Sequence, residues 1–205
     1  MKKFILTDET IETFGVTLHR IKAVRSFGNV KEGELGGFVE KEENISENFE
    51  AWVCDNAKVW GNAEVCGNAK VWGNAKVCGN AKVCDDAEVW GNAEVWGNAK
   101  VCGNAKVWGN AEVWGNAEVC DDAEVWGNAE VWGNAKVCGN ADYIVFKNWW
   151  SSGRYFTWTR SNNMWSVGCF YGTGEELIKK AYADSEKSGR EYERVVRFVE
   201  SILED

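Results

Sequence analysis

The sequence predicts an all-β solenoid, a parallel β-helix of hexapeptide repeats with three faces, about five regular coils and a small α+β cap at its C-terminal end. Three observations predict it: the unit Ala-x-Val-x-Gly-Asn recurs from residue 51 to residue 140, the outward positions recur every eighteen residues, and both flanks lack the repeat. We therefore divide the chain into an N-terminal β cap with an irregular first coil (1–50), the β-helix (51–140) and a C-terminal capping module (141–205).

Each hexad supplies one short strand and one corner. In Ala-Lys-Val-Trp the side chains alternate, so Ala and Val share one face and the charged residue and Trp or Cys share the other. We expect Ala and Val inside, because the opposite register would bury unpaired charges. Gly-Asn, replaced by Asp-Asn at 55–56 and Asp-Asp at 85–86 and 121–122, turns the corner, since these residues tolerate left-handed backbone angles.

The outward residue after each valine falls into three columns with a period of eighteen. The first column is Cys54, Trp72, Trp90, Trp108 and Trp126. The second column is Trp60, Cys78, Trp96, Trp114 and Trp132. The third column is Cys66, Cys84, Cys102, Cys120 and Cys138. A six-residue period cannot explain an all-cysteine column, so three hexads form one coil, and five coils at about 4.8 Å each span roughly 24 Å.

The N-terminal flank predicts β structure. Residues 16–24 alternate as a strand, and the glycines of residues 27–40 predict tight turns that lead into an irregular first coil. From Ile45 to Val53 the spacing is eight residues instead of six, which predicts a small bulge in that coil.

The C-terminal flank predicts a mixed module. Residues 143–146, 154–159 and 165–170 are expected to be strands, with turns at 151–153 and 161–163. Thr173 and Glu176 form a capping box that opens a helix from Gly174 to about Asp184. A second helix is expected from about Arg190 to Leu203, because its apolar residues recur on one stripe.

The repeat resembles a known family. The inward valine with a small inward residue four positions later, as in Val59-Trp60-Gly61-Asn62-Ala63, resembles the hexapeptide-repeat proteins that form left-handed parallel β-helices. Residues 18–28 and 33–40 resemble the N-terminal segment of a bacterial and bacteriophage group of such proteins, and residues 167–173 resemble the module that often closes them. The resemblance implies left-handed winding, and many members are labelled acetyltransferases from the repeat alone.

Composition restricts the partners and the compartment. The formal net charge is −9, so we expect nucleic acid to be an unlikely partner. No window approaches the ~18 apolar residues that cross a membrane, and Met1 is followed by no long apolar core, so we expect a cytoplasmic protein with reduced thiols.

The histidine content disfavours the enzymes that the resemblance implies. Hexapeptide-repeat acyltransferases use a histidine on the coils, and carbonic anhydrases of this fold bind zinc through several histidines, whereas this chain has one, His19, in the N-terminal cap. We therefore expect no catalytic residue and no cofactor, and we keep a divergent acyltransferase as the alternative.

The tryptophan columns are the candidate binding face. Rows of indole rings exceed the apolar patch usual for a monomer, which favours self-association or a host protein, with a glycan and simple stabilisation of the rows as further interpretations. The residues concerned are Trp60, Trp72, Trp90, Trp96, Trp108, Trp114, Trp126 and Trp132. The cysteine column is a second candidate, but we expect no metal there, because collinear thiols do not converge on an ion.

Two further sites are weaker candidates. Arg154, Trp158 and Arg160 lie in an aromatic and basic segment that could hold a nucleotide, although the rings also suit a module core. Glu94, Glu112 and Glu130 align in one column, which would suit a protein that mimics DNA. A DNA mimic is expected to have longer continuous acidic rows than this one. The sequence thus favours a non-enzymatic interaction or scaffold protein of a bacterium or bacteriophage that forms a homo-oligomer or binds a host protein.

Overall fold

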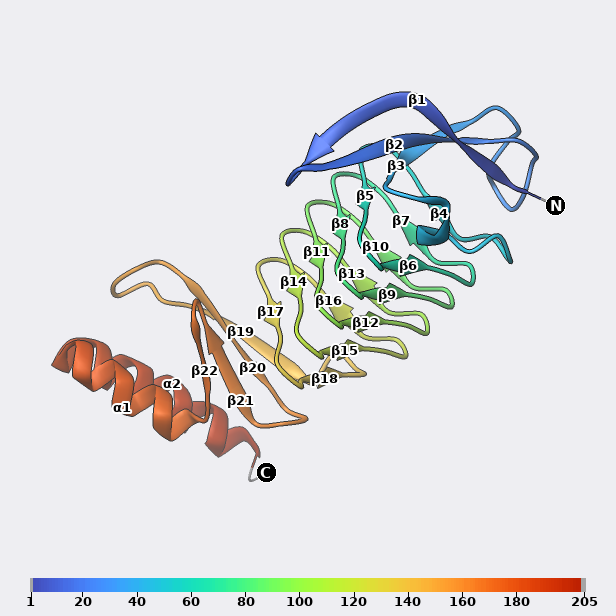
Figure 1. Ribbon diagram of the computed structural model, residues 1–205. Coiled ribbons are helices and arrows are strands. Elements are labelled where there is room, and N and C mark those ends of the chain that lie inside the picture. Colours follow the sequence, from blue (N-terminus) through green and yellow to red (C-terminus); the bar gives the residue numbers. More distant parts are fainter. Residues whose placement is uncertain (1, 204–205) are drawn as a thin grey trace.

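A computed structural model describes residues 2–203 and confirms the solenoid. Figure 1 shows an elongated molecule in which the N-terminal strands lie at one end, a stack of coils fills the middle, and a small sheet with two helices lies at the other end. The strands of the stack are β4 (Trp52–Val53), β5 (Lys58–Val59), β6 (Glu64–Val65), β7 (Lys70–Val71), β8 (Lys76–Val77), β9 (Lys82–Val83), β10 (Glu88–Val89), β11 (Glu94–Val95), β12 (Lys100–Val101), β13 (Lys106–Val107), β14 (Glu112–Val113), β15 (Glu118–Val119), β16 (Glu124–Val125), β17 (Glu130–Val131) and β18 (Lys136–Val137).

The stack has three faces, each a parallel sheet. The first face contains β4, β7, β10, β13 and β16, the second contains β5, β8, β11, β14 and β17, and the third contains β6, β9, β12, β15 and β18. Neighbouring strands pair in register eighteen residues apart, as Val59 pairs with Val77. The predicted period of one coil is therefore confirmed, and the columns of the sequence are columns in space.

The inward register is confirmed as well. The alanines and valines of the hexads are at most 1% exposed and form one continuous core. Each valine stands directly above the valine of the preceding coil, so the core is a stack of identical layers. Backbone bonds join the layers, for example from Trp60 N to Val77 O at 3.0 Å.

The corners explain Gly-Asn. Gly97 has a φ of +72°, and a Cβ there would lie 3.0 Å from Gly115 N of the next coil. Asn side chains at the second corner position bond from coil to coil, as Asn80 Nδ2 donates to Asn98 Oδ1 at 2.9 Å. At the first position Asp85 adopts φ +60°, and its Oδ2 accepts a bond from Gly103 N, which compensates the crowding.

The N-terminal cap extends the second face. Strand β3 (Leu35–Val39) pairs in parallel with β5, and β2 (Val16–Ala23) and β1 (Phe4–Thr13) add antiparallel to it. The predicted strand at 16–24 is confirmed, whereas β1 was not predicted, because its polar residues show no sustained alternation.

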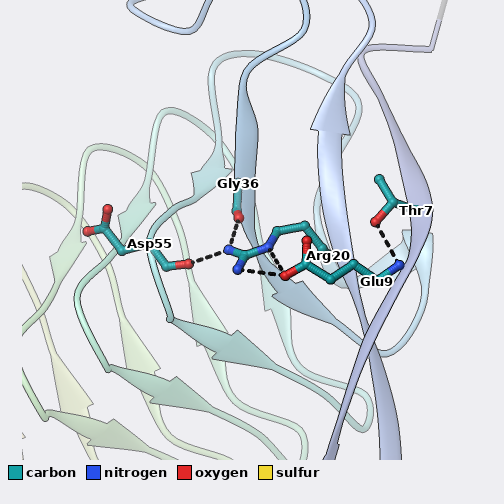
Figure 2. A network of polar contacts seen from close by, with 5 residues as sticks. All are labelled: Thr7, Glu9, Arg20, Gly36 and Asp55. Atoms are coloured by element: carbon teal, nitrogen blue, oxygen red, sulfur yellow. Dashed lines mark hydrogen bonds and ion pairs between the residues drawn. The ribbon is translucent and has the colours of Figure 1, made fainter.

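Arg20 fastens this hairpin to the coils. Figure 2 shows its guanidinium between Glu9 of β1, the carbonyl of Gly36 and the carbonyl of Asp55. Nη1 donates to both carbonyls at 2.9 Å, and Nε and Nη2 contact Glu9 Oε1 at 3.0 and 2.9 Å. The guanidinium also lies 4.1 Å from the centre of the Phe38 ring, so one side chain links three strands and a corner.

The first coil is irregular, as the spacing predicts. Ile45 forms a bridge with Val65 on the third face, and β3 occupies the second face, so these segments add most of a sixth turn below β4. A short 3₁₀ helix, η1 (Glu42–Asn44), lies between them. The segment from Ile45 to Val53, with its spacing of eight residues instead of six, contains the expected extra length.

The C-terminal module is a four-stranded antiparallel sheet followed by two helices. Its elements are β19 (Tyr143–Lys147), β20 (Tyr155–Thr159), β21 (Met164–Val167), β22 (Phe170–Gly172), α1 (Gly174–Asp184) and α2 (Glu186–Leu203). The predicted strand at 165–170 is wrong, because a turn at Gly168 (φ +56°) divides it into β21 and β22. The capping box of Thr173 and Glu176 is confirmed, and α2 begins four residues earlier than predicted.

This module seals the last coil with side chains. Thr157 Oγ1 accepts a bond from Glu130 N, and Ser166 Oγ donates to Glu130 O, both at 2.9 Å. The other two faces are closed in the same way, by Asn140 Oδ1 on Glu124 N, Tyr143 Oη on Glu124 O and Ser161 Oγ on Lys136 N. Because an open strand edge templates end-to-end association, these contacts disfavour stacking of molecules at this end.

Within residues 2–203, no helix combines the length and the apolar character that crossing a membrane requires.

Candidate interaction surfaces

The second face carries a closed tryptophan ladder. Trp96, Trp114 and Trp132, here called the second ladder, stack with ring centres 4.6 and 4.1 Å apart and planes within 9° of parallel. At the C-terminal end the ring of Tyr171 from β22 lies 4.5 Å from Trp132. A cap residue therefore covers the last ring of this row.

The first face carries an open ladder. Trp72, Trp90, Trp108 and Trp126, here called the first ladder, stack at 4.8, 4.9 and 6.1 Å. Trp126 is 57% exposed, whereas the other three rings of this row are only partly exposed. The row ends beside a hollow of about 520 Å³, lined by Trp126, Gly127, Asn128, Asn140, Tyr143, Ile144, Val145 and Tyr155.

Stacking explains why the ladders expose less apolar surface than rows of separate rings. Each indole covers the faces of its neighbours, so mainly the ring edges meet solvent. A stacked pair also contributes about 0.5–1.5 kcal/mol beyond simple burial. Stabilising the coils is thus part of what both rows do, and Trp126 is the ring of the eight that remains largely available.

Charges alternate on the first face. The outward strand residues read Lys70, Glu88, Lys106 and Glu124 from coil to coil, in register with one another. These four strand residues therefore carry no net charge, although the chain carries −9.

The second face separates its charges instead. Lys58 and Lys76 occupy its N-terminal coils, and Glu94, Glu112 and Glu130 follow. Burial, and then the adjacent Glu112 carboxylate, raises the pKa of Glu130 to about 7. The acidic row is thus short and partly neutral near pH 7, which suits a DNA mimic poorly.

The third face carries the cysteine column. Burial first, and then the Asp85 carboxylate and the neighbouring thiols, raises the pKa of the Cys84 thiol to about 12, and burial is also the leading cause that raises the pKa values of Cys66 and Cys102. Neutral thiols are weak nucleophiles and weak metal ligands. Cys120 and Cys138 form a disulfide with their Cα atoms 4.5 Å apart, although we expected reduced thiols; the one-coil spacing brings the two side chains together.

The Asp-Asp corners add ligands that sequence analysis missed. Asp85 brings a carboxylate oxygen within 4.8 Å of the thiols of Cys84 and Cys102, and Asp121 lies in the same way beside Cys120 and Cys138. The replacement of Gly by Asp at 85 and 121 was the signal for this grouping. Cys84, Asp85 and Cys102 are the residues that could hold a soft metal ion, although the raised thiol pKa values oppose it.

The three candidate residues of the C-terminal module are not brought together. Arg154 and Arg160 flank opposite ends of β20, six residues or roughly 20 Å apart in extended chain. Trp158 is 2% exposed, and its Nε1 donates to Asn163 Oδ1. Trp158 is thus a core residue, as the alternative interpretation of these rings held.

Arg154 instead borders a polar hollow between the small sheet and the helices. This cavity of about 320 Å³ is lined by Arg154 and Lys180 together with Asn148, Tyr192 and Asp184, among others. Lys180 was missed because it lies on the exposed side of a helix, where a lysine carries no signal of a site.

His19 lies on β2, away from the regular coils, and its Nδ1 is 3.2 Å from Thr7 O of the same hairpin. This contact supports the hairpin, and the one histidine of the chain lies outside the repeats.

The fold defines a class: a parallel β-helix of hexapeptide repeats, capped at both ends, with two aromatic ladders and one cysteine column on its three faces. No family model matches the chain, and no curated protein matches it.

Proposed function

We propose that this protein is a non-enzymatic scaffold whose first face is a contact surface for a second copy of the chain. The observation that carries the proposal is the open end of the first ladder, where Trp126 is 57% exposed beside a large hollow. An exposed tryptophan beside apolar residues is typical of interface anchors.

The charges of this face favour a second copy as the partner. If two molecules pack face to face with antiparallel axes, the centre falls between β10 and β13. Lys70 then opposes Glu124, and Glu88 opposes Lys106, so each of these four strand charges meets its opposite. The same arrangement sets Trp72 against Trp126 and Trp90 against Trp108. Such a self-complementary patch is what a two-fold dimer requires.

The size of the patch limits its affinity. Four coils at about 4.8 Å give a patch well below the ~800 Å² per partner of standard interfaces. We therefore expect a concentration-dependent dimer in the micromolar range, and the sealed last coil directs association sideways.

Sedimentation velocity over a concentration series tests the proposal. We expect wild type to dimerise and Trp126→Ser to remain monomeric, because the change removes the exposed anchor. Phe49→Ser is the matched control, since Phe49 is 72% exposed in the N-terminal flank and precedes β4, outside the four coils β7, β10, β13 and β16 that form the patch. A Trp126→Ser variant that dimerises as wild type does would refute this interface.

Charge reversal sharpens the test. Lys106→Glu places a second carboxylate opposite Glu88 of the other copy and should weaken the dimer, whereas Glu88→Lys combined with Lys106→Glu restores opposite charges and should rescue it. Loss without rescue would contradict the antiparallel arrangement.

Native mass spectrometry of protein isolated from a bacterial lysate separates the alternatives. A host-protein partner predicts an added protein mass, a ligand-capturing C-terminal module predicts a small added mass, and the acyltransferase that the family resemblance implies predicts binding of acetyl-CoA. We also propose that the protein is located in the cytoplasm and that it is encoded by a bacterium or a bacteriophage.

A further inference from the structure

The second column has one missing ring. Cys78 stands between Trp60 and Trp96, and the strands that carry them pair in register. At about 4.8 Å per coil the two indoles are roughly 9.6 Å apart along the stack. One planar ring placed between them would therefore have, on each side, the spacing that Trp96 and Trp114 show.

A cavity of about 300 Å³ lies at this gap. Its lining consists of Phe14, Trp60, Lys76, Cys78, Glu94 and Trp96. This volume matches the small end of ligand pockets, which begin near 300 Å³. Burial, and then the Glu94 carboxylate, raises the pKa of the Cys78 thiol to about 11, so the floor of the gap is a neutral, unreactive group.

Phe14 provides a second observation. It lies at the tip of the β1–β2 hairpin, which reaches along the coils from the N-terminal end (Figure 1). The residue is 83% exposed and has φ +50°, a backbone conformation that bulky residues rarely adopt. Its ring stacks 6.1 Å from Trp60 at 26°. The two-residue turn between Thr13 and Val16 accounts for the positive φ, and the exposed ring that this turn presents beside a gap between two indoles points to a binding role.

The edge of the gap is polar. Lys76 Nζ and Glu94 Oε1 form an ion pair at 2.7 Å, and the two side chains are 33% and 37% exposed to solvent. The pair offers a donor beside an acceptor. Adenine presents the complement, an acceptor at N7 beside the N6 amino donor, whereas guanine presents two acceptors at the same edge.

We propose that the gap between Trp60 and Trp96 is a binding slot for one neutral adenine-type ring, a free base or nucleoside. The ring stacks between the two indoles, Phe14 flanks it, and Lys76 and Glu94 recognise its edge. The acidic character of the chain disfavours the phosphates of a nucleotide.

Titration calorimetry and saturation-transfer NMR with adenosine test the slot. Wild type should bind adenosine saturably, and Cys78→Trp should abolish binding by inserting the missing ring. That variant continues the stacking of Trp96, Trp114 and Trp132, so we expect it to fold. Cys102→Trp is the matched control, because it adds an indole to the third face, and it should bind as wild type does.

Variants of Phe14, Lys76 and Glu94 test the slot independently of Cys78→Trp. Phe14→Ala should weaken binding about five-fold or more, since stacking on one aromatic ring carries an effect of this order. The double variant Lys76→Met with Glu94→Gln should lower the affinity for adenosine. It should leave the affinity for free indole, used as a second ligand, unchanged. If circular dichroism shows that Cys78→Trp is misfolded, the adenosine affinities of these two variants decide whether the slot is the binding site.

Three outcomes would overturn the proposal. Wild type that gives no signal with adenosine at about 1 mM excludes the slot. Binding that a folded Cys78→Trp variant keeps excludes this location. AMP or guanosine binding more tightly than adenosine excludes the assigned chemistry.

Discussion

The two tryptophan ladders are built from the same repeat but differ at their ends. The second ladder has Tyr171 on its last ring and the β1–β2 hairpin near its first coils, whereas the first ladder ends at the exposed Trp126. The repeat fixes the spacing and orientation of both rows, so the difference arises from the caps. Caps of a solenoid therefore decide which of its equivalent faces is available for contact.

The charges follow the same division. The open first face alternates lysine and glutamate, while the second face collects three glutamates toward the C-terminal cap. On the second face, burial and the adjacent Glu112 carboxylate raise the pKa of Glu130 to about 7, so partial protonation relieves the repulsion there. A face that meets a second copy benefits from alternating charges, because these avoid repulsion in the dimer.

Detaching the N-terminal hairpin, which lies near the first coils of the second ladder, is expected to have the largest effect on stability. Arg20→Leu removes bonds to the carbonyls of Gly36 and Asp55 and leaves both acceptors without that partner, which should lower the free energy of unfolding by about 2–4 kcal/mol. Urea denaturation measures it. Phe14→Ala on the same hairpin is the control and should change stability by about 1 kcal/mol or less, because the ring is exposed and stacks on one other ring, that of Trp60. Equal effects of the two variants would show that Arg20 does not fasten the hairpin.

Opening the C-terminal end of the second ladder should have a smaller effect. Tyr171→Ala removes the ring that covers Trp132 and the bond that Asn162 Nδ2 donates to its hydroxyl, and we expect a loss of about 2 kcal/mol in thermal or urea unfolding. Tyr171→Phe keeps the stack and should cost about 1 kcal/mol. If Phe and Ala cost the same, the ring does not contribute to the ladder.

The smallest effect concerns the raised pKa of Glu130, from its ordinary value of 4.5 to about 7. The folded state holds this proton more tightly than the unfolded state, so stability falls as pH rises from about 4.5 to about 7. Glu130→Gln removes that loss. The full shift corresponds to roughly 3 kcal/mol, and because the side chain is half-buried we expect about 1–2 kcal/mol of added stability at pH 8 and little at pH 4. The same gain at both values, in urea denaturation, would contradict the assignment.

The coils were predictable from sequence because their determinants are local and repeated. Alternation placed Val59 and Ala63 inside, and the period of eighteen placed Trp96 above Cys78. The capping box at Thr173 was equally readable, since it depends on two residues three positions apart.

Other features had no periodic signal. Strand β1 acquires its structure by pairing with β2, and the turn at Gly168 depends on packing of the small sheet. The site proposed for Arg154, Trp158 and Arg160 rested on closeness in sequence, yet an extended strand separates its two arginines and buries the ring between them. Lys180 reaches the hollow beside Arg154 from a helix that sequence analysis could not orient.

By itself, the sequence determined the coil, its inward residues and the three outward columns, because a strict repeat makes every local choice the same. Only the tertiary structure decided that Trp126 is open, that Tyr171 covers Trp132, and that Phe14 lies beside the gap at Cys78. These contacts join residues outside the repeat to residues within it. Their partners are selected by how the caps fold back on the coils, which no local pattern encodes.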